Sequence, residues 1–240
     1  MDNVFDRVLR ELEEAFRRLE GQVPPPVIKG YKGGFVLRYA ERTPQQAMLQ
    51  KFARQISGLH SLRLLLASGF LQEMGVIQPT LDDFEEDILF ITLAVVNEDM
   101  TEHHRQYLQF HWMEDRGDAG VNRGLVPRKH IRAYVAQHGG DDPSSMIAVG
   151  REIYKGYYGF VHGSGEAIID MCVADPPRYL LNGMIESPLY RDHQDDLWNY
   201  MYRGLVSATF MARLFGDDEL WGKCSRSMKG FEKTYHDKIF

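Results

Sequence analysis

The sequence contains few cysteines and no long apolar run. Its two cysteines, Cys172 and Cys224, lie far apart, which excludes a disulfide framework and a cysteine-rich zinc site. The longest apolar run, Ile88 to Val96, is well short of the roughly 20 residues that cross a bilayer. The amino terminus also lacks the apolar core of a signal peptide. We therefore expect a cytoplasmic protein without a membrane partner.

An excess of positive charge is also missing. The chain has 28 Lys and Arg against 34 Asp and Glu, so its net charge is −6. No overall positive field attracts phosphate groups, and a nucleic acid would need a local basic patch. The chain has neither a glycine-rich loop with the required lysine and hydroxyl residue nor a Gly-x-Ser-x-Gly elbow. These absences argue against a P-loop nucleotide site and a serine hydrolase.

Apolar residues recur with helical spacing along most of the chain. Hydrophobic residues make up 44% of the sequence, which is enough for a sizeable core. Residues 2–20 predict an amphipathic helix that ends at Gly21. Further helices are predicted at about 43–74, from 79 or 80 to 96, 99–114, 127–138, 144–173, 192–215 and 217–236. We predict an all-α, single-domain helical bundle over residues 43–240, preceded by an amino-terminal helix and connector over residues 1–42.

Three segments fit this scheme less simply. Residues 27–39 fit either a small hairpin across their glycines or an ordered loop, and their poor alternation favours the loop. Residues 116–124 are charged and glycine-rich, which predicts a second loop. For the acidic run DDFEED at residues 82–87, the first turns of a helix, where carboxylates suit the helix dipole, are favoured over a cation site.

The stretch YKGYYGFVHGSGEAIID at residues 154–170 has helical apolar spacing but contains four glycines. Each glycine inside a helix costs about 0.8–1 kcal/mol relative to alanine. We expect its small residues to form a bare row that lets a neighbouring helix approach closely, with His162 at the edge of the contact. The row and its flank are Gly156, Gly159, Gly163 and Ala167. Alternatively, the helix breaks at HGSG, where Ser164 caps a new helix and His162 lies at the junction.

Polar side chains surround His162 on the adjacent row. The candidate ligand-binding residues are Tyr154, Tyr158 and Glu166, and His162 is the candidate for chemistry because it changes charge near neutral pH. One hypothesis is a pocket that binds or acts on a ligand. The other is a core histidine whose ring nitrogens are satisfied by hydrogen bonds and which holds two helices in register.

Three segments resemble an uncharacterised bacterial helical family of unassigned function. They are YYGFVHGS at 157–164, LHSLRLLLASGFL at 59–71 and EDMTEHHRQYLQFHWMED at 98–115. The resemblance covers about residues 45–235 and implies an all-helical fold. In the family's Tyr-x-x-x-Ser-x-x-Val-His signature, Tyr154 and His162 match, while Tyr158 takes the place of the serine. The chain also lacks an arginine that the family tends to place in the helix here written EEDILFITLAVV.

A second resemblance is to HEPN-type helical bundles, which are ribonucleases marked by an arginine and a histidine with four to six residues between them. Histidine moves the proton of the attacking 2′-hydroxyl, and arginine stabilises the charged phosphate. Arg105 with His111 in RQYLQFH is the best match. Two other matching pairs that we considered are Arg54–His60 and Arg132–His138. The alternative function is therefore a metal-independent ribonuclease of the toxin or phage-defence type.

Histidines and carboxylates also gather at residues 98–111, but without the repeated Glu-x-x-His spacing of a helical metal site. We predict no metal site and no cofactor. The main hypothesis is a binding or regulatory module with a polar pocket around His162. Its partner is a small ligand or a protein; RNA belongs to the ribonuclease hypothesis, and a homodimer is compatible with both.

Overall fold

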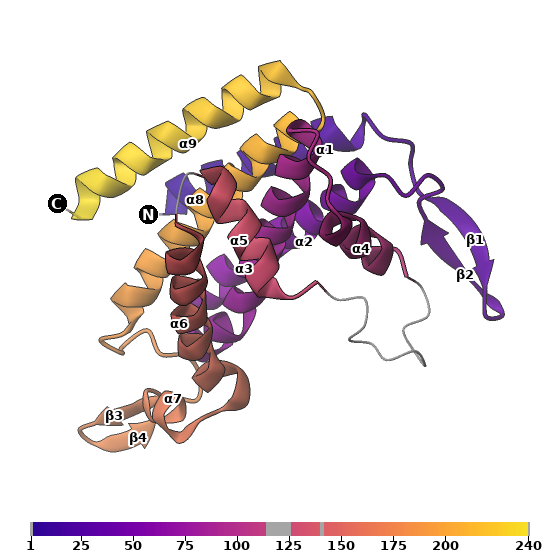
Figure 1. Ribbon diagram of the computed structural model, residues 1–240. Coiled ribbons are helices and arrows are strands. Elements are labelled where there is room, and N and C mark those ends of the chain that lie inside the picture. The colour runs from indigo at the N-terminus through magenta and orange to yellow at the C-terminus, as the bar shows by residue number, and fades with distance from the viewer. Residues whose placement is uncertain (1, 114–125, 140–141, 240) are drawn as a thin grey trace.

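The computed structural model describes residues 2–113, 126–139 and 142–239, and these residues form helices with two small hairpins (Figure 1). This arrangement confirms the all-α prediction. The loop predicted for residues 116–124 lies outside the described residues. The helices are α1 (Asp2–Glu20), α2 (Pro44–Ala67), α3 (Leu71–Val96), α4 (Glu102–His111), α5 (Arg128–Gly139), α6 (Pro143–His162), α7 (Gly165–Ile169), α8 (Tyr190–Leu214) and α9 (Asp218–Ile239).

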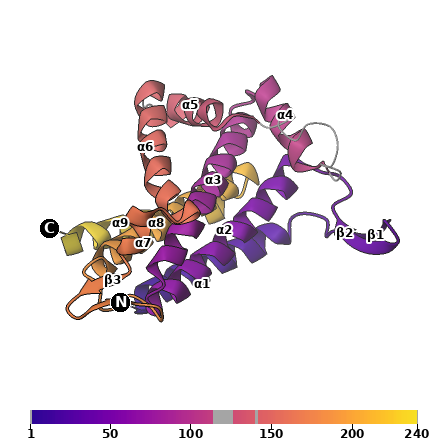
Figure 2. The ribbon, with the colours of Figure 1, turned by 90° about the horizontal axis from the view of Figure 1, so that it is seen from below.

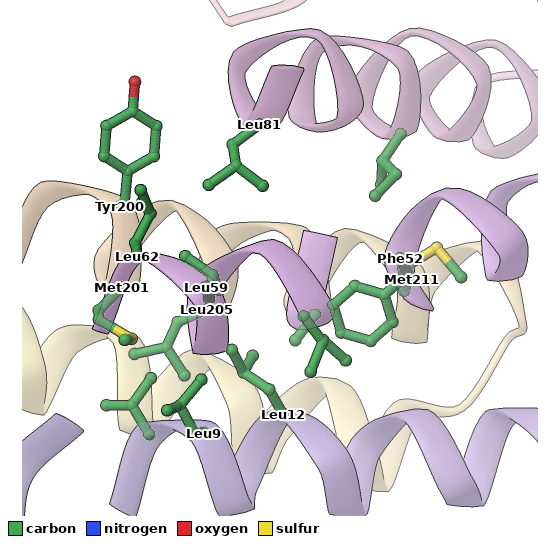
Figure 3. Close-up of a cluster of buried hydrophobic side chains, with 14 of the residues drawn as sticks. Leu9, Leu12, Phe52, Leu59, Leu62, Leu81, Tyr200, Met201, Leu205 and Met211 are labelled. Carbon is green, nitrogen blue, oxygen red and sulfur yellow. The ribbon is translucent and has the colours of Figure 1, made fainter. Parts of the chain in front are cut away.

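The core lies between α1, α2, α3 and α8, which pack side by side (Figure 2). Leu12, Leu59 and Leu81 are almost fully buried and point toward one another in Figure 3. Gly204 of α8 lets this contact close, because a Cβ atom there would lie 2.7 Å from Leu59 Cδ1. Each buried leucine contributes about 1.5–3 kcal/mol. The boundary predicted at residue 42 stays a prediction, although α1 itself is part of the core.

The junction between α2 and α3 differs from the predicted one. The helix expected to reach residue 74 ends at Ala67. Gly69, in the turn that follows, adopts a φ of 75°. The helix start predicted near residue 80 is also wrong, because α3 begins at Leu71 and contains Pro79. An internal proline costs about 3 kcal/mol. Burial of Leu71 and Met74, both 0% exposed, offsets that cost.

Strands β1 (Val27–Tyr31) and β2 (Gly34–Arg38) form an antiparallel hairpin that extends away from the helices in both views (Figures 1 and 2). The loop prediction for residues 27–39 is therefore wrong. Lys32 and Gly33 have φ values of 46° and 81°, as in a two-residue hairpin turn. Alternation was weak because neither face is buried: Ile28 and Leu37, which pair across the strands, are 71% and 61% exposed.

The helix predicted over residues 144–173 is wrong in its second half. It ends at His162, where Gly163 takes a left-handed φ of 62°. The Ser164 hydroxyl then accepts a hydrogen bond from the Ala167 N–H and caps α7. The alternative break at HGSG is thus confirmed. A second hairpin, β3 (Cys172–Ala174) and β4 (Pro177–Tyr179), follows and had no counterpart among the predicted elements.

Among the helices of the described residues, none combines the length and the apolar composition that crossing a bilayer requires.

Candidate functional site

No long helix packs along the glycine row of α6 in the described part of the chain, and only the short helix α7 approaches it, at Gly159. A Cβ atom on Gly156 would meet nothing within 4 Å. One on Gly159 would meet Ser164 Oγ at 3.0 Å and Ala167 Cβ at 3.3 Å, that is, the N-cap residue and the middle of α7. Gly163 ends the helix. The close approach expected at this row is therefore wrong.

Close approaches to α6 do occur, at other glycines. A Cβ atom on Gly75 of α3 would lie 2.5 Å from Cγ of Phe160, so the aromatic ring covers that glycine. A Cβ atom on Gly150 of α6 would lie 2.8 Å from the Arg132 guanidinium of α5. These two contacts position α6 against α3 and α5.

The side chains predicted around His162 lie on the surface. His162 and Glu166 are exposed, and Tyr154 and Tyr158 are 59% and 57% exposed. The structure brings His162 and Tyr158 together, with 4.4 Å between their ring centroids. The core-histidine hypothesis is wrong, because the imidazole is exposed, and a pocket centred on this residue is not supported. Tyr154 instead faces the cavity described below.

The predicted nuclease pair is separated. The exposed Arg105 side chain donates to the carbonyl of Met100 at 2.9 Å and to Glu102 at 3.3 Å. His111 Nε2 lies 2.9 Å from Gln50 Oε1. Six residues of helix turn through about 600°, which places the two side chains on different faces of α4. This geometry does not favour a ribonuclease site within one chain.

The other histidines of this region have structural contacts. His104 is fully buried, its ring stacks on Phe90 at 3.9 Å, and its Nδ1 lies 2.7 Å from the Thr101 hydroxyl. Burial lowers the pKa of His104 to about 4, so this ring is neutral at physiological pH. The His103 ring packs on His130. Among the described residues, no three His, Cys, Asp or Glu side chains are arranged to hold a metal ion.

The acidic run at residues 82–87 lies in the middle of α3, not in the first turns of a helix as predicted. Asp82 and Glu85 are three residues apart and therefore face the same side, toward α8. Both are 7% exposed. The Arg203 guanidinium of α8 donates through Nη1 to Asp82 and through Nε to Glu85. Two buried carboxylates thus share one cation.

A chain of hydroxyl groups reaches this ion pair from α6. The Tyr200 hydroxyl of α8 points out of the apolar core in Figure 3 and donates to Asp82 at 2.9 Å. Since Tyr200 donates there, the Tyr157 hydroxyl of α6 donates to Tyr200. Burial raises the pKa of Tyr200 strongly and that of Tyr157 to about 12, so both hydroxyls keep their protons.

The other side of the acidic run holds α5 and α2. Arg128 of α5 contacts Asp83 at 2.8 Å and also donates to Asp87. Three further contacts complete the network: Arg132 to Glu86 at 2.7 Å, Arg128 to Glu86 at 3.7 Å, and Lys51 to Asp87 at 2.9 Å. On this side the three carboxylates face three cations.

On the α8 side, by contrast, two carboxylates face a single cation, so negative charge is in excess there. Burial raises the pKa of Glu85 to about 7, and the attraction of Arg203 offsets this only in part. Burial alone would lower the pKa of Arg203, but the charges of Glu85 and Asp82 outweigh it and raise that pKa. The guanidinium therefore stays charged. Glu85 is the surplus carboxylate, and it exchanges a proton near neutral pH.

A cavity of about 370 Å³ lies against this network, between α3, α5, α6 and α8. We call it the interhelical cavity. Its charged lining consists of Asp82, Asp83, Glu85, Glu86, Arg132 and Arg203. The remaining lining is aromatic, amide or apolar and comprises Tyr154, Tyr157, Asn199, Pro79, Leu89, Val135, Gly150 and Ile153. Charged groups and apolar walls therefore meet in one half-open cavity.

Two other hollows are less suited to a ligand. A surface groove of about 990 Å³ runs between α1 and α2, but its charged side chains, such as Glu13 and Arg17, are exposed rather than buried. A cavity of about 320 Å³ lies beside α4, where Lys51 and Arg128 contribute to the same ion-pair network. Of the three, the interhelical cavity has the most buried polar groups, and we take it as the candidate site.

No protein-family model, curated protein or solved structure matches this chain. The resemblance to an uncharacterised helical family stays a prediction. Sequence reasoning missed Asp82, Glu85 and Arg203. One signal was available for Arg203, which stands in the apolar stretch MYRGLVSATFMA, where an arginine must find buried acidic partners.

Proposed function

We propose that this protein is a binding module whose small ligand occupies the interhelical cavity. Binding sites for small molecules are concave, mostly apolar and equipped with a few fixed polar groups. The single observation that carries the proposal is the meeting of buried charges with apolar and aromatic walls around one cavity. We therefore propose a ligand site that lies more than one helical turn from His162, toward the start of α6.

Tyr154 is the residue that best separates this proposal from a pocket at His162. It lines the cavity and is 59% exposed, so it stands at the rim, where its loss leaves the fold intact. Tyr158 lies one turn further along α6, has a similar exposure of 57% and packs on His162 instead. Alanine variants of the two tyrosines can therefore be compared directly, because the two side chains are similarly exposed and only Tyr154 lines the interhelical cavity.

The test measures thermal stabilisation of the purified protein by a panel of amines, carboxylates, sugars and nucleotides. A ligand at 100 times its Kd stabilises the folded state by about 2.7 kcal/mol. We expect a ligand whose stabilisation is lost in Tyr154→Ala and retained in Tyr158→Ala. Equal loss in both variants, or loss in His162→Ala alone, contradicts a site in the interhelical cavity.

A further inference from the structure

The charges of the interhelical cavity define the ligand more closely. We propose that the ligand is an organic monocation, a protonated amine or amidinium group on a short apolar body, held by the carboxylates of Asp82 and Glu85. This inference rests on the proposed function and specifies the ligand class for the same cavity.

The first argument is the count of charges. On the α8 side, Asp82 and Glu85 share the one guanidinium of Arg203. On the α5 side, three carboxylates face three cations, namely Asp83, Glu86 and Asp87 with Lys51, Arg128 and Arg132. Within the described residues of this network, one negative charge is therefore unmatched when Glu85 is ionised, and it lies beside the cavity. A single positive charge completes the network.

The second argument concerns the guanidinium groups. Both arginines that line the cavity already donate to carboxylates: Arg203 to Asp82 and Glu85, and Arg132 to Glu86. An anionic ligand would add a further negative charge beside carboxylates that already outnumber the cations on the α8 side, which is unfavourable. A cation adds to the network without breaking it.

The third argument is the rest of the lining. Leu89, Val135 and Ile153 supply apolar surface, and the rings of Tyr154 and Tyr157 also face the cavity. Aromatic faces attract cations, and apolar walls bind a hydrocarbon body. In the described residues, no three acidic, histidine or cysteine side chains converge on a metal position. An organic cation suits this surface better than a bare metal ion.

The protonation of Glu85 supports the same class of ligand. The charged groups that face it are Asp82 and Glu86 of α3 and Arg203 of α8, with Tyr202 of α8 nearby. Burial raises its pKa to about 7, so the unliganded site holds a proton for part of the time at neutral pH. A bound cation replaces that proton. Binding of an amine at pH 7 should therefore release protons.

The experiment uses two matched sets of probes: 2-phenylethylamine, 2-phenylethanol and phenylacetate, and butylamine, butanol and butyrate. Calorimetry at pH 7 in two buffers of different ionisation enthalpy reports both affinity and proton release. We expect the amines to bind with proton release and the alcohols and acids to bind at least roughly tenfold more weakly. Glu85→Gln should abolish the proton release and weaken amine binding by a similar factor.

If Glu85→Gln fails to fold, Tyr154→Ala and Tyr158→Ala still test the inference. Both tyrosines are exposed, so neither substitution should disturb the fold. Amine binding that Tyr154→Ala weakens and Tyr158→Ala leaves intact supports the inference. Tyr154-dependent binding of an acid or an alcohol with equal or higher affinity overturns the organic-cation inference while leaving the proposed function in place. If no probe and no compound of the wider panel binds, the proposed function itself is wrong.

Discussion

The bundle of α1, α2, α3 and α8 and the arm made of α5 and α6 are stabilised in different ways. The bundle buries large apolar side chains completely, among them Leu12, Phe52 and Leu62. By contrast, every α6 side chain that the structure describes is at least partly exposed, and α5 buries Ile131 and Ala136. The arm is held to α3 by ion pairs and by the contact of Phe160 with Gly75.

This difference places the candidate site at the boundary between a rigid and a weakly packed region. Local opening is easiest where few apolar contacts and many solvent-facing polar contacts hold an element. The interhelical cavity has α3 and α8 of the bundle on one side and the arm on the other. A ligand there would tie the arm to the bundle, so binding and arm stability should change together.

The largest expected effect is the loss of a core side chain. Leu12→Ala removes a leucine that is 0% exposed and should lower the free energy of unfolding by about 2–5 kcal/mol. The matched arm variant is Val161→Ala, at a residue that is 46% exposed. It should change stability by less than about 0.5 kcal/mol. Chemical denaturation measures both, and similar losses would remove the distinction between bundle and arm.

The second effect tests the contact that holds α6. Gly75→Ala places a methyl group 2.5 Å from Phe160 Cγ and should destabilise the protein by about 1–3 kcal/mol, despite the higher helix propensity of alanine. Hydrogen exchange should rise most in α6. Phe160→Ala alone should also loosen α6.

The double variant Gly75→Ala, Phe160→Ala is the control for that contact. The alanine methyl no longer meets a ring, so the double variant should be no less stable than Phe160→Ala alone. Full additivity of the two losses would show that the Gly75 effect does not arise from Phe160.

The third prediction concerns the pH dependence of the ion-pair network. The pKa of Glu85 is raised from 4.5 to about 7, so between these values the folded state holds a proton that the unfolded state has lost. Its contribution to stability is therefore largest near pH 4.5, falls as pH rises to about 7 and is constant above that. The wild type should lose stability relative to Glu85→Gln across this window, by roughly 3 kcal/mol. If the stability of the wild type relative to Glu85→Gln instead rises with pH, Glu85 is already ionised in the folded state across this window.

Local pattern was sufficient for much of the fold. The helices predicted at 127–138, 192–215 and 217–236 lie within a few residues of α5, α8 and α9, because each has its own apolar periodicity and end signals. The start of α3 was predicted too late because Pro79 was taken as a helix start. In the structure Pro79 lies inside α3, where packing against other helices outweighs its cost. The β1–β2 hairpin was only the less favoured of two predictions for residues 27–39, because a strand pair without a buried face leaves no clear alternation in the sequence.

The candidate site depends on contacts that no local pattern contains. Tyr200 lies 118 residues from Asp82, and only the packing of α8 on α3 brings them together. Of the predicted site residues, Tyr154 lines the interhelical cavity, whereas the exposed His162 is not part of its lining. Ligand binding by Tyr154 stays a prediction. The glycines of α6 suggested close packing, and the close contacts use Gly75 and Gly150 instead.

The smallest expected effect returns to the bare glycine row. A methyl group on Gly156 meets open space, so Gly156→Ala should stabilise the protein by about 0.5–1 kcal/mol through helix propensity alone. This is opposite in sign to Gly75→Ala, and chemical denaturation of the two variants under identical conditions tests the contrast. Destabilisation by Gly156→Ala that grows with protein concentration would instead show a second copy packed on this row. The exposed face of α6 would then be the contact of a homodimer, and the comparison between bundle and arm would hold for the isolated chain alone.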